Sequence, residues 1–265
     1  MAQPLLSDAL WQRIEPLLPS PKPRRFRFPG RKPLTNRQAL TGILFVLRTG
    51  IRWNDLPCEM GCGSGSACRK RLQAWQELGI WDQLHHLLLN ELREADKIDW
   101  SRAAVDSSFV RALGGGEDTG PNPTDRGKKG SKHHVVVDAR GIPLSATVTA
   151  ANKPDVNELL DVVDAIPAVA GKVGRPKQRP EKLYGDRAYD SEEHREELRD
   201  RSVEPKLAKR NTEHGSGLGV YRWVAERFIS WLHRFRKLRL RTDWYSSTHH
   251  GLLKLACSLI CLSFL

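Results

Sequence analysis

The chain has 265 residues, with 43 Lys plus Arg against 31 Asp plus Glu, and a formal net charge of +12 at pH 7. This length is sufficient for a sizeable core and a small additional domain, and the positive charge favours a polyanionic partner such as nucleic acid. No apolar run is long enough to span a membrane and no signal-peptide core opens the chain, so we expect a cytoplasmic protein.

The cysteines argue against a disulfide framework, because their number is odd and their spacing uneven. Cys58, Cys62 and Cys68 are candidate zinc ligands, because thiolates bind this metal. Their spacing is loose, and no second Cys or His pair follows closely. Structural zinc sites normally present four ligands in two close pairs. We therefore expect no zinc site here.

Helical periodicity dominates the first third of the chain. Four helices are predicted, over residues 7–18, 36–49, 66–78 and 81–95, with Ser7 as the first N-cap and Gly50 ending the second. A Pro-rich basic segment, 19–33, separates the first two and suits contact with a phosphate backbone. The third helix carries Arg69, Lys70, Arg71 and Gln73. Short helices with a basic one among them are typical of a helix-turn-helix module, and a helical cap on another domain is the alternative.

From Ile98 onward the pattern changes to alternating strands and helices. Strands are predicted at 101–110, 133–139, 143–149, 183–184 and 203–207, and helices at 155–166, 191–201 and 221–237. Residues 114–130, between the first two strands, are rich in Gly, Pro and Lys and predict a flexible basic loop. The last 15 residues are apolar and predict a packed final helix.

Three carboxylates stand out in this second part. Asp106 is near the end of a predicted buried strand, Asp186 follows a short strand and Gly185, and Glu226 is on a predicted helix. Taken singly, an acid at a strand end is more often a turn or cap residue. Together they make a candidate site for two divalent ions, because Mg²⁺ and Mn²⁺ prefer carboxylate oxygens.

The predicted helix 221–237 places Glu226 on a basic stripe. Glu226, Ser230, His233, Arg234 and Lys237 fall on one side of an ideal helix, opposite an apolar face. A lone acid among cations can bind a metal ion while its neighbours neutralise phosphates. A solvated helix face with an ion pair explains the same pattern.

Several longer strings resemble a transposase of the bacterial insertion-sequence-five family, and the match covers nearly the whole chain. They include VDSSFVRA, GPNPTDRGKKGSKHH, DARGIPLSATVTAAN, YGDRAYDS, TEHGSGLGVYRWVAERFISWLHRFRKLRLR and LLKLACSLICL. The resemblance implies a ribonuclease H-like fold and a DDE catalytic triad of Asp106, Asp186 and Glu226, with Arg222 completing part of a Y-R-E-K signature. The tyrosine position of that signature is Gly219 here, and its basic position is His233.

The resemblance also implies an organisation and an activity. We expect an all-helical, helix-turn-helix-like DNA-binding domain at 1–96 and a ribonuclease H-like α/β catalytic domain at 97–265. The expected activity is cleavage and strand transfer at the ends of an insertion element, using two Mg²⁺ or Mn²⁺ ions. A homodimer or larger assembly on double-stranded DNA, associated with the nucleoid, is expected. A nuclease without strand transfer and an inactive DNA-binding copy are the alternatives.

We expect DNA contacts in two regions, the basic third helix and the helix that carries Glu226. Arg69, Lys70, Arg71 and Gln73 would read the terminal repeats. Arg222, His233, Arg234 and Lys237 would hold the DNA backbone near the acids.

Overall fold

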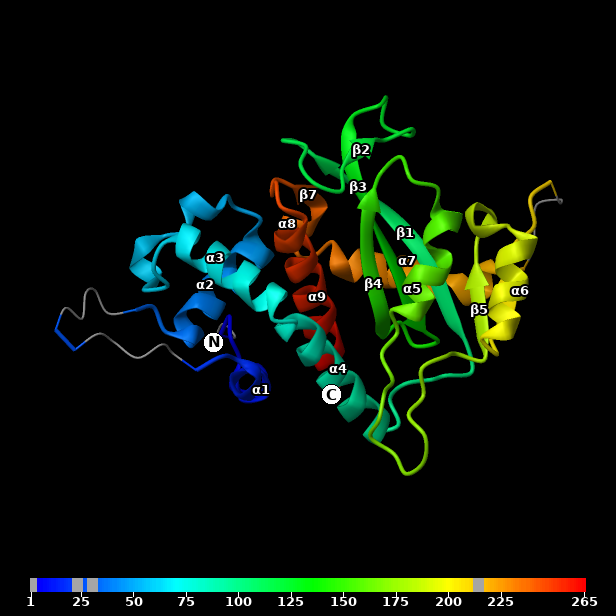
Figure 1. Ribbon diagram of the computed structural model, residues 1–265, viewed down its shortest axis with the longest axis horizontal. Coiled ribbons are helices and arrows are strands. Elements are labelled where there is room, and N and C mark those ends of the chain that lie inside the picture. Colours follow the sequence, from blue (N-terminus) through cyan, green and yellow to red (C-terminus); the bar gives the residue numbers. More distant parts are fainter. Residues whose placement is uncertain (1–3, 21–25, 28–32, 212–216) are drawn as a thin grey trace.

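The computed structural model describes residues 4–20, 26–27, 33–211 and 217–265. The helical first part and the sheet are connected by the C-terminal helix α9 (Ser246–Leu262), which packs against α3, α4 and β4 (Figure 1). Helices α1 to α4 are α1 (Asp8–Ile14), α2 (Asn36–Thr49), α3 (Gly65–Glu77) and α4 (Ile80–Glu94). Short 3-10 turns lie at Glu15–Leu17, Trp53–Asp55 and Cys58–Met60.

The predicted helix boundaries in this part agree with the structure to within a few residues. Ser7 caps α1 by accepting a hydrogen bond from the Leu10 backbone N–H (3.2 Å), and Thr35 and Gln38 form a capping box at α2. Gly50 ends α2 in the left-handed conformation that glycine favours. The predicted basic segment 19–33 lies mostly outside the described residues.

The second part contains the sheet. Its strands are β1 (Ala103–Ala112), β2 (Gly120–Pro121), β3 (Lys129–Asp138), β4 (Pro143–Ala150), β5 (Lys182–Gly185), β6 (Glu204–Leu207) and β7 (Leu240–Arg241). Its helices, besides α9, are α5 (Leu159–Asp164), α6 (Glu192–Asp200), α7 (Gly219–Leu232) and α8 (Arg236–Arg239), with 3-10 turns at Asp155–Glu158 and Arg187–Tyr189.

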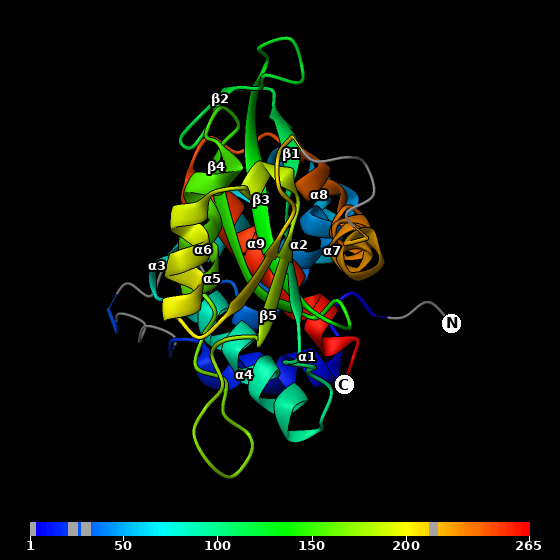
Figure 2. The ribbon, with the colours of Figure 1, turned by 90° about the vertical axis from the view of Figure 1, so that its right-hand side faces the viewer.

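The strand order identifies the fold. β4, β3 and β1 are antiparallel neighbours, and β5 and then β6 continue beside β1 in parallel. The short strands β2 and β7 pair with β3 and β1. α5 and α6 cover one face of the sheet and α7 covers the other (Figure 2). An antiparallel meander followed by two parallel strands with helices on both faces is the ribonuclease H-like arrangement, as predicted.

Two predicted segments differ from the structure. The helix predicted over 221–237 ends at Leu232, because the chain turns at Phe235 (φ −79°, ψ 93°) and restarts as α8. The loop predicted over 114–130 contains β2, whose residues pair with Lys129 and Gly130. In both cases contacts with distant parts of the chain decide the local structure.

One hydrophobic cluster joins the two parts of the chain. It includes Leu40 and Trp75 from the helical part, Val136 from the sheet and Cys257 from α9. The change from an all-helical to an α/β pattern falls between α4 and β1, and α9 packs against elements on both sides of it.

Candidate active site

Asp106 lies within β1, on the face of the sheet that α7 covers. Side chains alternate along a strand, so Asp106 shares its face with Ser108, and the residue opposite Ser108 on β3 is His133. His133 contacts His249 of α9, with ring centroids 4.9 Å apart. The Asp106 carboxylate accepts a hydrogen bond from the Ser107 backbone N–H (2.8 Å).

Asp186 follows β5 directly and stands beside Asp106. β1 and β5 are parallel, with Ala103 paired to Leu183 and Ala104 to Tyr184. Continued by two residues, this register aligns Asp106 with Asp186, whose backbone is still extended (φ −81°, ψ −173°). Adjacent strands lie about 4.8 Å apart, so the two carboxylates are neighbours across the strand pair.

Helix α7 brings Glu226 and Arg222 to the same place. The helix packs against β1, β3 and β5, and the Tyr221 ring lies 4.6 Å from the Tyr184 ring. Arg222 and Glu226 are one helical turn apart and therefore share a side of α7. The Arg222 guanidinium lies 4.0 Å from the Asp186 carboxylate.

The pKa of Asp106 reports the electrostatics of this site. Burial raises the pKa to about 6, the Ser107 hydrogen bond and Arg222 lower it, and the negative charges of Asp186 and Glu226 raise it. Coulomb interactions weaken with distance, so Asp186, Glu226 and Arg222 each lie within electrostatic range of Asp106. A cation bound among the acids would favour ionised Asp106.

The donors present fit divalent metal ions, because all three predicted ligands are carboxylates. In the described part of the chain, however, no group of three or more His, Cys, Asp or Glu side chains is close enough to surround a single ion. Glu226 is solvent-exposed, whereas Asp106 and Asp186 are partly buried. A pair of ions does not require all three acids to surround one ion, because two metals about 3.5–4 Å apart divide the ligands between them.

Ser108 and His233 form a contact that the sequence reasoning missed. The Ser108 hydroxyl lies 3.3 Å from His233 Nε2, just past the end of α7. Ser108 is two residues after Asp106, so strand alternation could have identified it. His233 is partly buried, and burial lowers its pKa.

Lys237 is not on the predicted basic stripe. It is 1% exposed and donates hydrogen bonds to the Ile51 carbonyl (3.2 Å) and the Thr242 hydroxyl (2.7 Å). The prediction of a DNA contact at Lys237 is corrected, because the end of α7 at Leu232 turns this residue into the core. Arg234 is exposed, as predicted.

The four residues predicted to read DNA from α3 differ in their surroundings. Lys70 is exposed, and Arg69, Arg71 and Gln73 are partly buried. Arg71 donates a hydrogen bond to the Asn36 side chain at the start of α2 and stacks on Trp75, 5.7 Å from the ring centroid. Arg71 thus contributes to packing between α2 and α3.

Comparison with known families identifies the chain. A model described as "Transposase DDE domain" matches residues 101–261, which contain all three acids. The chain belongs to the DDE transposase family. A second model, "Putative transposase of IS4/5 family", matches residues 6–85 of this transposase. The enzyme class predicted from the sequence is therefore confirmed, and with it the use of divalent metal ions.

Two relatives from Burkholderia cepacia are highly similar to parts of the transposase. "Putative transposase for insertion sequence element IS402" is 59% identical over 143 residues, covering 54% of this chain and 68% of the relative. "Insertion element IS402 uncharacterized 16.2 kDa protein" is 64% identical over 123 residues, covering 46% of this chain and 84% of the relative.

Among solved structures, the likeness is weaker. The crystal structure of the Mos1 mariner paired end complex with Mn aligns with 97% of the transposase and 86% of its own chain, at 12% identity and a TM-score of 0.34. The crystal structure of the Mos1 strand transfer complex aligns with 88% of the transposase and 79% of its own chain, at 12% identity and a TM-score of 0.33. Among the described residues, no helix is both long and apolar enough to cross a membrane.

Proposed function

We propose that this transposase cleaves DNA at the ends of its insertion element and joins the ends to a target, with Asp106, Asp186 and Glu226 as the catalytic, metal-binding acids. The observation that supports this most is the β1–β5 register, which sets Asp106 beside Asp186, together with Arg222 of α7 at 4.0 Å from Asp186. These groups come from β1, the residue after β5, and α7, the helix that packs against both strands.

We infer that two Mg²⁺ or Mn²⁺ ions bind there. When bound, such a pair supplies activation of the attacking hydroxyl and stabilisation of the leaving 3′-oxygen. Asp106, Asp186 and Glu226 would hold the two ions between them, because carboxylate oxygens are the ligands that these ions prefer. Arg222 would orient Asp186, because the guanidinium and the carboxylate are 4.0 Å apart.

Residues around the acids would position the DNA. His233, held by Ser108, and the exposed Arg234 lie just beyond the C-terminal end of α7 and would contact the backbone near the scissile phosphate. Backbone contacts of this kind set the register of the protein on DNA and carry no sequence information.

The helical part would recognise the element ends. We propose that residues 1–96 form the DNA-binding unit and 97–265 the catalytic unit, with Arg69, Lys70 and Gln73 of α3 as contacts. Arg71 would support α3 through its bond to Asn36. Because two ends must be held together during transposition, we propose that a homodimer is the smallest active form on DNA.

Substitution of Asp106 tests this proposal. Asp106→Ala should abolish strand transfer from a duplex carrying the element end and leave binding of that duplex measurable. Glu193→Ala removes an exposed acid from the first turn of α6 and should retain transfer. Transfer by the Asp106→Ala variant at the wild-type rate would refute the assignment. DNA hydrolysis without joining by the wild-type protein would instead indicate a nuclease.

A further inference from the structure

The segment 113–129, here called the arm, runs from the end of β1 to the first residue of β3 and projects from one end of the sheet (Figure 1). Hydrogen bonds fix its base. The Asp118 carbonyl accepts hydrogen bonds from Arg241 (3.2 Å) and from the Ser131 hydroxyl (2.7 Å), and the Glu117 backbone N–H donates to the Trp244 carbonyl (3.0 Å). The arm is therefore held in one orientation relative to β1.

The acidic residues of the arm are all engaged within the protein. Glu117 accepts a hydrogen bond from the Ser246 backbone N–H (2.9 Å), and Asp118 accepts one from the Ser246 hydroxyl, both at the start of α9. Negative charge is favourable at a helix N-terminus. Asp125 lies 3.8 Å from Arg111 of β1.

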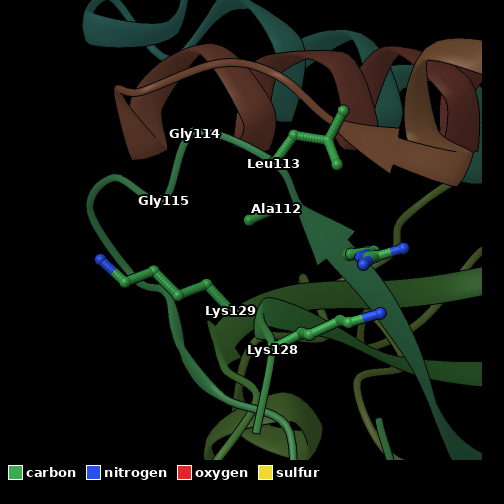
Figure 3. Close-up of a pocket in the computed structure, with 7 residues that line it drawn as sticks. Ala112, Leu113, Gly114, Gly115, Lys128 and Lys129 are labelled. Atoms are coloured by element: carbon green, nitrogen blue, oxygen red, sulfur yellow. The ribbon is translucent and has the colours of Figure 1, made fainter. Parts of the chain in front are cut away.

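The cations of the arm have no such partners. Arg126 and Lys129 are exposed and Lys128 is partly exposed. Within the described residues, none of these three side chains forms an ion pair. Lys128 and Lys129 line a recess of about 360 Å³ together with Gly114 and Gly115. Figure 3 shows the two lysine side chains extending in opposite directions, so they would reach separate anionic groups.

We propose that Arg126, Lys128 and Lys129 bind the sugar-phosphate backbone of a DNA duplex whose scissile phosphate is at the acids. This inference rests on the proposed function and adds a second contact to the same DNA. The acids of the arm face α9 and Arg111, so the outward-facing side of the arm is positive and matches a polyanion.

The spacing along β1 agrees with this contact. Arg111, at the base of the recess, is five residues beyond Asp106 on the same strand. At roughly 3.3 Å per residue this separation is about 17 Å. A DNA strand advances about 3.4 Å per nucleotide along the helix axis, so the arm would contact phosphates about five base pairs from the cleavage point.

The experiment compares two triple variants of the full chain. The arm variant carries Arg126→Ala, Lys128→Ala and Lys129→Ala, which together remove the cations of the arm. The control variant carries Lys97→Ala, Arg175→Ala and Lys177→Ala. It loses three exposed cations that also form no ion pair among the described residues. Residues 175 and 177 belong to the loop before β5, at the opposite end of the sheet (Figure 1). Affinity for an element-end duplex is measured by fluorescence anisotropy at several salt concentrations.

Each lost phosphate contact should reduce the slope of log affinity against log salt concentration by about 0.9. We expect a reduction of about 2–3 in the arm variant and a nearly unchanged slope in the control variant. Replacing the same three residues conservatively (Arg126→Lys, Lys128→Arg, Lys129→Arg) should keep the wild-type slope. A wild-type slope in a folded arm variant would overturn the inference. If the triple variant does not fold, Lys128→Ala and Lys129→Ala singly should each lower the slope by about 0.9.

A second measurement locates the contact. Two duplexes are prepared, each ending about three base pairs from the cleavage point, one on the left side and one on the right. One of them lacks the phosphates about five base pairs away that the arm would contact, and on that duplex the wild type and the arm variant should bind equally. A difference that persists on both shortened duplexes would contradict the location. Failure of wild-type strand transfer would refute the proposed function and leave the salt measurement interpretable. Strand transfer by the wild type, together with an unchanged salt slope in the arm variant, would refute the arm contact alone.

Discussion

Asp106 of β1 lies opposite Asp186, the residue that follows β5, because the parallel register that pairs Ala104 with Tyr184 aligns the two acids when it is continued by two residues. Parallel neighbours with the same register point their side chains to the same face. That face is covered by α7, which adds Arg222 and Glu226. Two acids separated by 80 positions in the chain thereby become a neighbouring pair.

Asp106→Asn should stabilise the folded protein at high pH. Burial raises the pKa of Asp106 to about 6 from the usual 3.8, so the folded state binds this proton more tightly than the unfolded state. The ionised side chain therefore becomes increasingly destabilising as the pH rises from 3.8 to 6. A shift of two units corresponds to about 3 kcal/mol, which solvent screening at a partly exposed side chain reduces to roughly 1–2 kcal/mol.

Urea unfolding at several pH values measures this effect. The free energy of unfolding of the Asn variant should exceed that of the wild type by roughly 1–2 kcal/mol at pH 8. The difference should shrink as the pH is lowered toward 4, because Asp106 is then protonated in the folded state. A gain independent of pH would show that charge burial is not its cause.

Mn²⁺ or Mg²⁺ should raise the melting temperature of the wild-type protein without DNA. A ligand that binds only the folded state stabilises by about 2.7 kcal/mol at a concentration of 100 times Kd. Asp186→Asn and Glu226→Gln should each reduce the shift, and Glu193→Gln, on the exposed side of α6, should not. Equal shifts in all variants, measured by differential scanning fluorimetry, would place the metal elsewhere.

Lys237→Ala should destabilise the fold, in contrast to Arg234→Ala. Lys237 is buried and lies 3.8 Å from Asp243, which also accepts a hydrogen bond from the Trp53 indole (2.7 Å). Removing the ammonium group leaves a buried carboxylate without its cation, at a cost of about 3–5 kcal/mol. The exposed Arg234 should change stability by about 0.5 kcal/mol or less and lower the salt dependence of DNA binding. Chemical denaturation separates the two effects.

Gly65→Ala and Gly219→Ala should change stability in opposite directions. A Cβ atom at Gly65 would lie 1.6 Å from the Trp53 carbonyl oxygen, so the start of α3 must move, at a cost of about 3 kcal/mol or more. A Cβ atom at Gly219 meets nothing within 4 Å, and alanine in the first turn of α7 should stabilise by about 0.5 kcal/mol. Thermal unfolding of both variants tests the packing at each helix start.

Local patterns predicted most elements of the structure. Helix α2 begins at Asn36 and ends at Thr49 as predicted, because a capping box and a terminal glycine are short-range signals. The order of strands and helices likewise predicted the ribonuclease H-like sheet. The end of α7 was not predictable, because the residues up to Lys237 continue its pattern while the turn at Phe235 buries Lys237 beside Ile51.

The sequence by itself determined the positive charge, the elements and the three acids with their motifs, since each depends on residues close together in the chain. Only the tertiary structure decided which cations face solvent. It buried Lys237, joined Arg71 to Asn36 and left Arg126 and Lys129 of the arm exposed. A charged side chain becomes a DNA contact or a core ion pair according to what packs around it. That packing depends on segments such as α9 and the arm, which are far apart in sequence.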